Sequence, residues 1–168
     1  MKYLAFCLLA LVLSIPAVAQ DDKPLSDKTN ALIEKAEGGE AEAQEKLGNW
    51  YLFGLFVEMD GKLAVKWFRK AAEQGHLRAQ WMLGSMYARG DGVLQDDNEA
   101  VKWYRMAADQ GLANAQSNLG VCYLKGQGVE QDHVEAVAWY RKAADQGHAN
   151  AQFNLGVCYE DGEGVPKD

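Results

Sequence analysis

The sequence predicts an all-α protein, a solenoid of stacked helix-turn-helix repeats of 36 residues. One observation is an Ala-Gln pair that returns at a fixed spacing. A second is that the units align without a gap, and a third is the helical spacing of apolar residues inside each unit. Such a period is typical of stacked repeats rather than of a globular enzyme domain. The pairs are Ala43-Gln44, Ala79-Gln80, Ala115-Gln116 and Ala151-Gln152.

The period divides the chain into its expected parts. Residues 31–42 resemble the end of a second helix, so we expect a helix that caps the N-terminal end of the stack. Residues 20–30, rich in Asp and Lys, predict a flexible lead-in. The repeats themselves are residues 43–78, 79–114, 115–150 and a half repeat at 151–168.

Residues 1–19 have the pattern of a cleavable secretory signal. Lys2 precedes an apolar run from Leu4 to Leu13, and the small residues Ala17-Val18-Ala19 follow. The run is about half of the roughly 20 residues that a helix needs to cross a bilayer. We expect cleavage after Ala19, export to the periplasm or the extracellular space, and no stable membrane span in the mature protein. An uncleaved N-terminal anchor is the alternative.

The chain is acidic, with a formal net charge of −7 at pH 7, and Lys2 is the only charged residue of the signal. An acidic exported protein is a poor candidate for binding nucleic acid or anionic lipid. No phosphate-cradling glycine loop follows a strand, so no cofactor is expected.

The third repeat illustrates the first helix of a unit. Ala115, Leu119, Cys122 and Tyr123 recur at the spacing of one apolar helix face. The helix ends in a glycine-containing turn. Gly92, Gly128 and Gly164 give such turns the backbone freedom that they need.

The second helix opens with Asp132, three residues before Glu135, and Asp96 and Glu99 repeat the arrangement. We expect a capping aspartate with a reciprocal glutamate. Aromatic residues and paired alanines follow, which favour close helix packing. Each second helix is expected to end at a left-handed glycine. These glycines are Gly75, Gly111 and Gly147.

The outer face of the second helices carries arginines with an acidic residue four positions later. We expect solvated, weak i,i+4 charge pairs there. The pairs are Arg69 with Glu73, Arg105 with Asp109, and Arg141 with Asp145.

Cys122 and Cys158 remain once the signal is removed, and they occupy the same repeat position. Equivalent positions in successive repeats are separated by at least one helix-packing distance, about 8–10 Å. A disulfide needs Cα atoms within about 7 Å. We therefore expect free buried thiols rather than a bridge or a metal site.

The repeated pattern Ala-Gln-x-x-Leu-Gly-x-x-Tyr-x-x-Gly-x-Gly-Val, followed by Asp-x-x-x-Ala-x-x-Trp-Tyr-x-x-Ala-Ala-x-Gln-Gly, resembles the Sel-1-like repeat family. This family is related to the tetratricopeptide repeats, and the resemblance covers residues 31–168. It implies a right-handed α-solenoid that binds other proteins as a scaffold or adaptor. It implies no particular partner.

Two departures from the pattern stand at the ends. Phe56 replaces the second loop glycine and Leu63 replaces the acidic capping partner, so the first turn is expected to be built differently. Asp168 is the predicted cap of a second helix that is absent. We therefore expect either a fragment of a longer repeat protein, or an open end that meets a partner or another copy of the chain.

Six residues on the first helices point away from the core face, and several of them are too apolar for an ordinary solvent face. We expect them to line a concave groove that binds a protein or peptide partner. Packing between repeats is the open alternative. The residues are Trp81, Ser85, Val121, Leu124, Phe153 and Val157.

Catalysis is not expected. Some secreted, cysteine-rich relatives of the family are described as β-lactamases, and a β-lactamase-like enzyme is the alternative. Their paired cysteines within each repeat are missing here, as is Ser-x-x-Lys with its companion motifs. His76 and His148 share a repeat position with Leu112, so this position is not a catalytic requirement, and no metal site is expected. A third class is a structural protein that self-assembles through its open C-terminal end.

Overall fold

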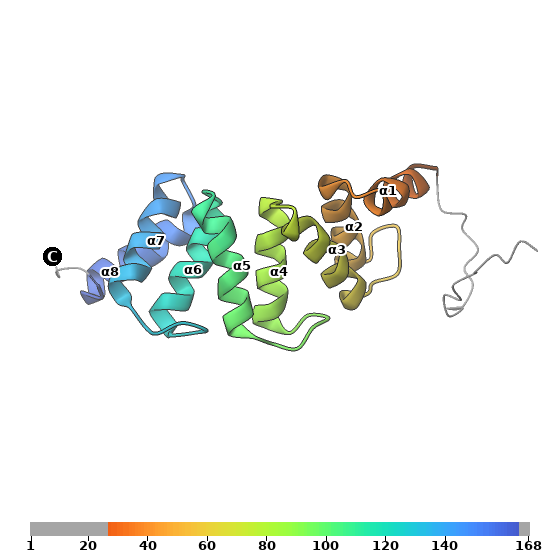
Figure 1. Cartoon of the computed structure of the whole chain (residues 1–168). Coiled ribbons are helices and arrows are strands. Elements are labelled where there is room, and N and C mark those ends of the chain that lie inside the picture. The colour runs from red at the N-terminus through yellow and green to blue at the C-terminus, as the bar shows by residue number, and fades with distance from the viewer. Residues whose placement is uncertain (1–26, 165–168) are drawn as a thin grey trace, which may run out of the picture.

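The structure, a computed structural model, describes residues 27–164, which form helices joined by turns and contain no strand. The helices stand side by side in chain order, from α1 at one end of the stack to α8 at the other (Figure 1). The predicted all-α solenoid is therefore confirmed. The helices are α1 Asp27–Glu37, α2 Ala41–Phe53, α3 Gly61–Glu73, α4 Leu77–Arg89, α5 Asp97–Asp109, α6 Ala113–Lys125, α7 His133–Asp145 and α8 Ala149–Asp161.

The second helices α3, α5 and α7 begin as predicted. In each, an aspartate side chain accepts hydrogen bonds from backbone N–H groups of the first turn, which otherwise have no partner. The capping residues are Asp60, Asp96 and Asp132.

The glutamates three residues after these caps do not have the reciprocal role that the sequence suggested. Glu99 pairs instead with the ammonium group of Lys102. Glu135 accepts a hydrogen bond from the indole Nε1 of Trp139 at 2.9 Å. Partners one helical turn away on the same face therefore compete successfully with the cap for these carboxylates.

The predicted left-handed glycines follow the second helices after one intervening glutamine. After α3, the Gly75 N–H donates to Ala72 O and the His76 N–H donates to Ala71 O, so the last carbonyl groups of the helix are satisfied. Gly75 has φ 85°, and Gly111 and Gly147 are also left-handed.

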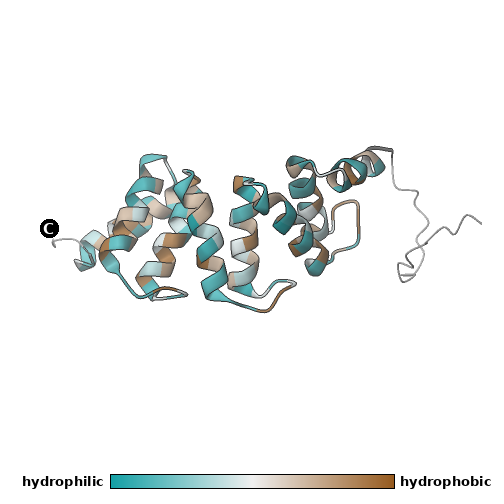
Figure 2. Cartoon of the chain, in the orientation of Figure 1, coloured by the Kyte–Doolittle hydropathy of each residue, from teal (hydrophilic) through white to brown (hydrophobic). Residues whose placement is uncertain are grey.

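The core lies between successive helices and is built around one recurring contact. A glycine in each internal first helix faces an aromatic ring of the following second helix. A Cβ at Gly120 would lie 2.6 Å from Cε1 of Tyr140, and one at Gly84 would lie 2.7 Å from Cδ1 of Tyr104. Only a glycine therefore allows the two helices to approach this closely. Figure 2 shows hydrophobic positions alternating with polar ones along these helices.

The leading helix has different bounds from those expected. It runs from Asp27 to Glu37 rather than over residues 31–42, so residues 27–30 belong to it and not to the lead-in. Gly39, at φ 99°, ends the connection, and α2 begins at Ala41. The signal, its cleavage site and residues 20–26 lie outside the described residues.

The first turn was expected to be built differently from the others, and this was wrong. Gly54 and Phe56 have φ 65° and 63°, and the corresponding Gly90 and Gly92 have 74° and 69°. Phe56 therefore adopts a left-handed conformation that glycine usually occupies. Its ring packs on Trp50, with 4.8 Å between the ring centroids.

The expected i,i+4 charge pairs on the second helices are also replaced. Each arginine reaches the tyrosine of the next first helix instead, donating to its hydroxyl group and lying over its ring. A hydrogen bond and a cation–π contact together hold the guanidinium group there. The arginines therefore connect neighbouring repeats. The pairs are Arg69–Tyr87, Arg105–Tyr123 and Arg141–Tyr159.

Candidate partner-binding surface

The six predicted groove residues lie on α4, α6 and α8, in three different environments. Ser85 is buried, and its hydroxyl group donates to Trp81 O at 3.0 Å. Val121 and Leu124 are half-buried and pack against the hydrophobic cluster around Tyr140. These residues therefore take part in packing between helices.

The two remaining residues, Phe153 and Val157, lie on α8. Phe153 is 72% exposed and Val157 is 37% exposed. The equivalent Ser117 of α6, by contrast, is buried. The predicted residues are thus at least partly covered on the internal helices α4 and α6. On α8, the last described helix, they are accessible to solvent.

Trp81 and Ser85 share a depression of about 370 Å³ between α2 and α4. The Nε1 of Trp81 is buried there and has no hydrogen-bond partner among the described residues. A buried N–H group without an acceptor is costly. The other lining residues are Leu52, Phe53, Met82, Arg89 and Asp91.

The loop after α2 also carries exposed apolar side chains. Phe53, which lines the depression, is 61% exposed, and Phe56 is 73% exposed. Leu55 and Met59 are exposed as well, and Figure 2 shows this loop as hydrophobic. Contiguous exposed apolar residues mark interaction surfaces more often than scattered ones do. We call Phe53, Leu55, Phe56, Met59 and Trp81 the α2–α4 apolar surface.

Sequence reasoning noticed Phe56 only as a departure from the turn pattern. A second signal was available, because the same segment of the other loops is glycine-containing and largely polar. Four large apolar residues between positions 53 and 59 therefore distinguish the first loop.

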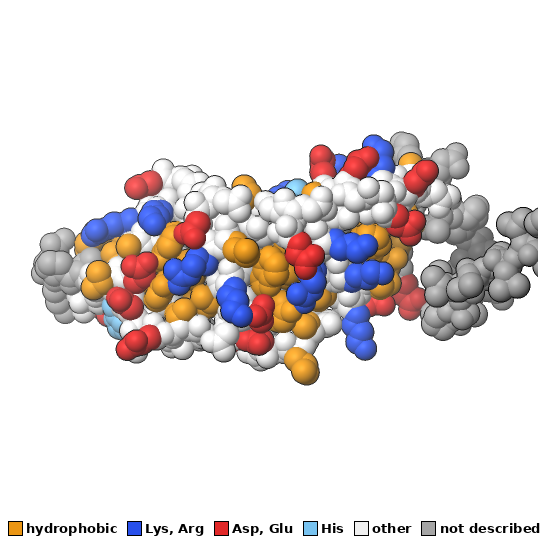
Figure 3. Space-filling view, in the orientation of Figure 1, with side chains coloured by type: hydrophobic (Ala, Val, Ile, Leu, Met, Phe, Trp, Pro, Cys, Tyr) orange, Lys and Arg blue, Asp and Glu red, His pale blue; other side chains and the backbone are white. Residues whose placement is uncertain are grey.

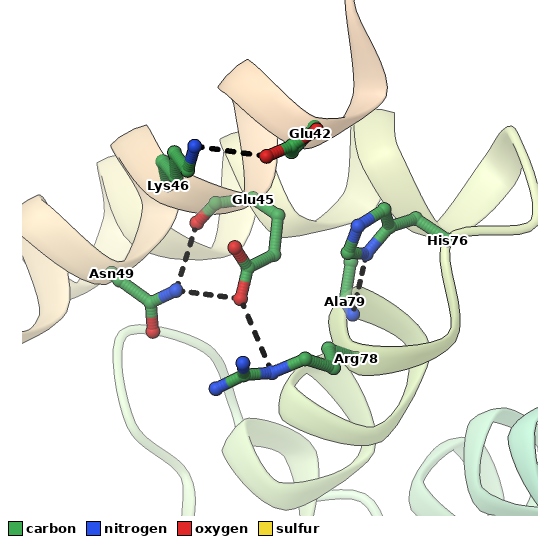
Figure 4. Close-up of polar contacts among 7 residues, drawn as sticks. All are labelled: Glu42, Glu45, Lys46, Asn49, His76, Arg78 and Ala79. Carbon is green, nitrogen blue, oxygen red and sulfur yellow. Dashed lines mark hydrogen bonds and ion pairs between the residues drawn. The ribbon is translucent and has the colours of Figure 1, made fainter.

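A polar cluster also bridges α2 and α4 (Figure 4). Glu45 is buried, accepts a hydrogen bond from Asn49 Nδ2 at 2.7 Å, and lies 3.7 Å from Arg78 Nε. Nearby, the hydrogen bond and charge of Lys46 lower the pKa of Glu42. Glu45 in α2 occupies the same repeat position as Trp81 in α4. This position is therefore charged in the first repeat and apolar in the second.

A second depression, of about 440 Å³, lies on α5 around Trp103 and Met106. In α3 and α7 the corresponding tryptophans are covered by lysines, with Lys142 Nζ 3.7 Å from the Trp139 ring centroid. Met106 takes the place of that lysine and is half exposed. Hydrophobic side chains gather over the middle of the face in Figure 3, between basic and acidic ones.

The recurring glutamines, whose hydrogen bonds sequence reasoning did not predict, form a ladder along the stack. Each first-helix glutamine donates to a carbonyl group of the preceding helix, as Gln116 does to Ala108 O at 3.1 Å. Gln44, Gln80 and Gln116 also accept from a glutamine at the end of the following second helix, as Gln116 does from Gln146 at 2.7 Å. The 36-residue recurrence of both glutamines was the available signal.

The histidines and cysteines have structural positions. The Nδ1 atoms of His76 and His148 accept from the N–H groups of Ala79 and Ala151, so both histidines cap first helices. Cys122 and Cys158 are buried free thiols. Burial raises the pKa of Cys122 to about 11 and also raises that of Cys158.

Among residues 27–164, no group of three or more His, Cys, Asp or Glu side chains is placed to hold a metal ion. No helix in the same range has the length and apolar character that a membrane span requires.

Known proteins share this repeat pattern and this architecture. A model of the Sel1 repeat matches residues 41–76, 77–112, 113–148 and 149–168, which keeps the predicted period but begins two residues earlier. A search of curated proteins gives no match.

Three solved structures are similar. A protective antigen present in uropathogenic Escherichia coli strains, with an SLR fold, shares 47% identity at a TM-score of 0.81, covering 83% of this chain and 30% of the antigen. A Sel1 repeat protein from Oxalobacter formigenes shares 40% identity at a TM-score of 0.77, covering 83% of this chain and 57% of that protein. Cysteine rich protein B from Helicobacter pylori, at 21% identity and a TM-score of 0.61, covers 78% of this chain and 94% of its own and shows the fold alone.

The chain thus spans less than two thirds of the first two of these proteins. Four matched repeats nevertheless cover most of its own length. The chain belongs to the Sel1 repeat family, whose members typically act as protein–protein interaction scaffolds.

Proposed function

We propose that this protein is an exported, non-enzymatic scaffold that binds a protein or peptide partner in the cell envelope through the α2–α4 apolar surface. The observation that carries the proposal is the Trp81 depression, which Phe53 lines, together with the exposed apolar side chains of Leu55 and Met59 in the loop after Phe53. An apolar surface beside a shallow depression fits the side chains of a polypeptide better than a small polar substrate.

Two details of this surface favour a polypeptide. The buried Nε1 of Trp81 has no acceptor among the described residues, and a backbone carbonyl group of a partner that enters the depression would accept a hydrogen bond from it. Phe56 keeps an exposed aromatic ring in a left-handed conformation that disfavours it. Such local strain is typical of positions retained for binding.

The binding test compares matched baits. Residues 20–168 and the variant Phe53→Ser/Met59→Ser are each used to capture proteins from a cell-envelope extract. Leu94→Ser is the control, because Leu94 is an exposed apolar residue in the corresponding loop of the next repeat. A partner captured by the native bait and the control, but lost with the double variant, supports the proposal. Equal capture by all three baits contradicts it.

Trp81→Phe tests the indole N–H while it keeps an aromatic ring in the depression. We expect weaker capture of the same partner, with unfolding of the bait little changed. Unchanged capture would assign recognition to the apolar contacts alone.

Export is proposed from residues 1–19 and is tested separately. The intact mass of the protein isolated from its host is expected to correspond to a chain that begins at Gln20. A protein that retains residues 1–19 would contradict cleavage after Ala19.

A further inference from the structure

Three equivalent tryptophans lie on the second helices α3, α5 and α7, and they differ in what covers their rings. The Nζ of Lys70 lies 4.8 Å from the centroid of the Trp67 ring, and the Nζ of Lys142 lies 3.7 Å from that of Trp139. The exposed fraction of these two tryptophans is only 6% and 4%. In both repeats, the lysine three residues after the tryptophan thus holds its ammonium group over the ring as a cation–π contact.

Trp103 of α5 has no such cover. Met106 stands at the position of the lysine. Among residues 27–164, the cations that lie over aromatic rings include none over Trp103, and Lys102 pairs with Glu99 instead. Trp103 is accordingly more exposed than its two equivalents, and it lines the depression of about 440 Å³ together with Met106. We call this the α5 depression.

The charges that line the α5 depression leave one carboxylate without a partner. Asp109 forms no ion pair with any residue of the described range. Glu99 is neutralised by Lys102, and the guanidinium group of Arg105 is held over the Tyr123 ring, 5.6 Å from its centroid. An incoming cation would therefore meet an aromatic ring and an uncompensated negative charge, a combination that attracts ammonium groups.

The repeat of α7 shows that an ammonium group fits this arrangement. Arg141 and Asp145 are the equivalents of Arg105 and Asp109, and Lys142 lies over its tryptophan beside that arginine. We propose that the α5 depression binds a lysine side chain of a partner polypeptide.

In the complex, the ammonium group lies over the Trp103 ring and faces Asp109, while the aliphatic stem of the lysine packs on the half-exposed Met106. A free amine is a poorer occupant, because one cation–π contact at a surface contributes little affinity by itself and a polypeptide adds further contacts. All the lining residues belong to α5, so the site is separate from the α2–α4 apolar surface and does not rest on the proposed function.

The probe is an array of short peptides of varied sequence, each with a single lysine at its centre. Every peptide has a twin in which norleucine replaces the lysine, because norleucine keeps the aliphatic stem and lacks the ammonium group. Residues 20–168 are applied to the array, and the peptide with the largest preference over its twin is measured in solution by fluorescence anisotropy. We expect it to bind about tenfold more tightly than its twin.

Met106→Lys is the decisive variant. It gives α5 the lysine that α3 and α7 carry, and a residue found twice at this repeat position keeps the fold. The new ammonium group should cover Trp103 and weaken peptide binding by about tenfold. Leu94→Lys adds the same charge at an exposed loop position and should leave binding nearly unchanged. Lys142→Met should uncover the tryptophan of α7 and create a second site for the peptide.

Asp109→Asn should also weaken binding, whereas Asp145→Asn, beside a ring that is already covered, should not. The proposal is overturned if no lysine peptide binds better than its twin, or if Met106→Lys and Leu94→Lys bind alike. Displacement of the peptide by an equal concentration of n-butylamine would assign the depression to a small amine and likewise overturn it. The Phe53→Ser/Met59→Ser variant is expected to bind the lysine peptide normally, so this proposal and the proposed function fail separately.

Discussion

Helices α6 and α8 share ten of their thirteen residues and differ in what covers them. Leu119 and Gln116 of α6 are buried between α5 and α7, whereas the equivalent Leu155 and Gln152 of α8 are accessible to solvent. The same side chain is therefore core in one repeat and surface in the other. In a solenoid each repeat contacts only its neighbours, so burial is decided by the neighbouring helix.

The largest expected effect comes from removing the ring that covers α6. Tyr140→Ala should lower the free energy of unfolding by about 3–5 kcal/mol, because a fully buried aromatic side chain is lost. Phe153→Ala on α8 should change it by less than about 0.5 kcal/mol. Urea denaturation followed by circular dichroism measures both. Similar losses would show that α8 is covered in solution.

A Cβ added at the glycine tests the same contact from the other side. Gly120→Leu should cost about 2–3 kcal/mol, because the new side chain overlaps the Tyr140 ring. Gly156→Leu should stabilise the chain slightly, by about 0.5–1 kcal/mol, because glycine is a poor helix former. Thermal unfolding of the two variants would contradict the comparison if both lost stability.

The glutamine ladder provides a smaller contrast. Gln116→Ala should cost about 1–2 kcal/mol, because it removes two hydrogen bonds, one to the Ala108 carbonyl group and one from the Gln146 amide. Gln152→Ala, on the exposed end, should cost less than about 0.5 kcal/mol. Chemical denaturation of the pair checks the difference, and equal costs would mean that the ladder is not governed by burial.

Alkylation of Cys122 and Cys158 distinguishes local opening of α8 from global unfolding, and it requires no substitution that changes the stability of the chain. Cys158 is at least as buried as Cys122, but opening α8 alone exposes it, so we expect alkylation at pH 8 to be about tenfold faster at Cys158. Because labelling takes place in the opened state, where the thiols are exposed, both rates should increase with pH as the exposed thiols ionise. Mass spectrometry of each labelled site gives the rates. Faster labelling of Cys122 would contradict independent opening of α8.

The free energy of unfolding should decrease as the pH rises above about 9, because the buried thiol of Cys122 then tends to ionise. The pKa of Cys122 in the folded chain, about 11, lies above the ordinary thiol value of 9.0 because burial disfavours the thiolate. Its contribution to stability is present below pH 9 and is lost as pH rises from about 9 to 11. Cys122→Ala should reduce this loss in denaturation curves recorded at pH 8 and pH 10. An unchanged slope would show that Cys122 is not the group responsible.

Periodicity was sufficient to predict the solenoid, the paired helices, the aspartate caps and the left-handed glycines, because these features depend on local sequence. It could not predict the partners of Arg105 or Glu135, since a helix face offers several contacts of similar energy and packing selects among them. The α2–α4 apolar surface escaped prediction for a related reason. Phe53 belongs to the end of a helix and Trp81 to the next repeat, and only the fold brings them together.

Amide hydrogen exchange of α6 and α8 in residues 20–168 tests the central claim most directly. If α8 is packed on one side only, its amides should exchange at least about a hundredfold faster than the equivalent amides of α6, because local opening then costs less than global unfolding. Equal protection of the two helices would contradict this account and show that the α8 face is already covered in the free protein.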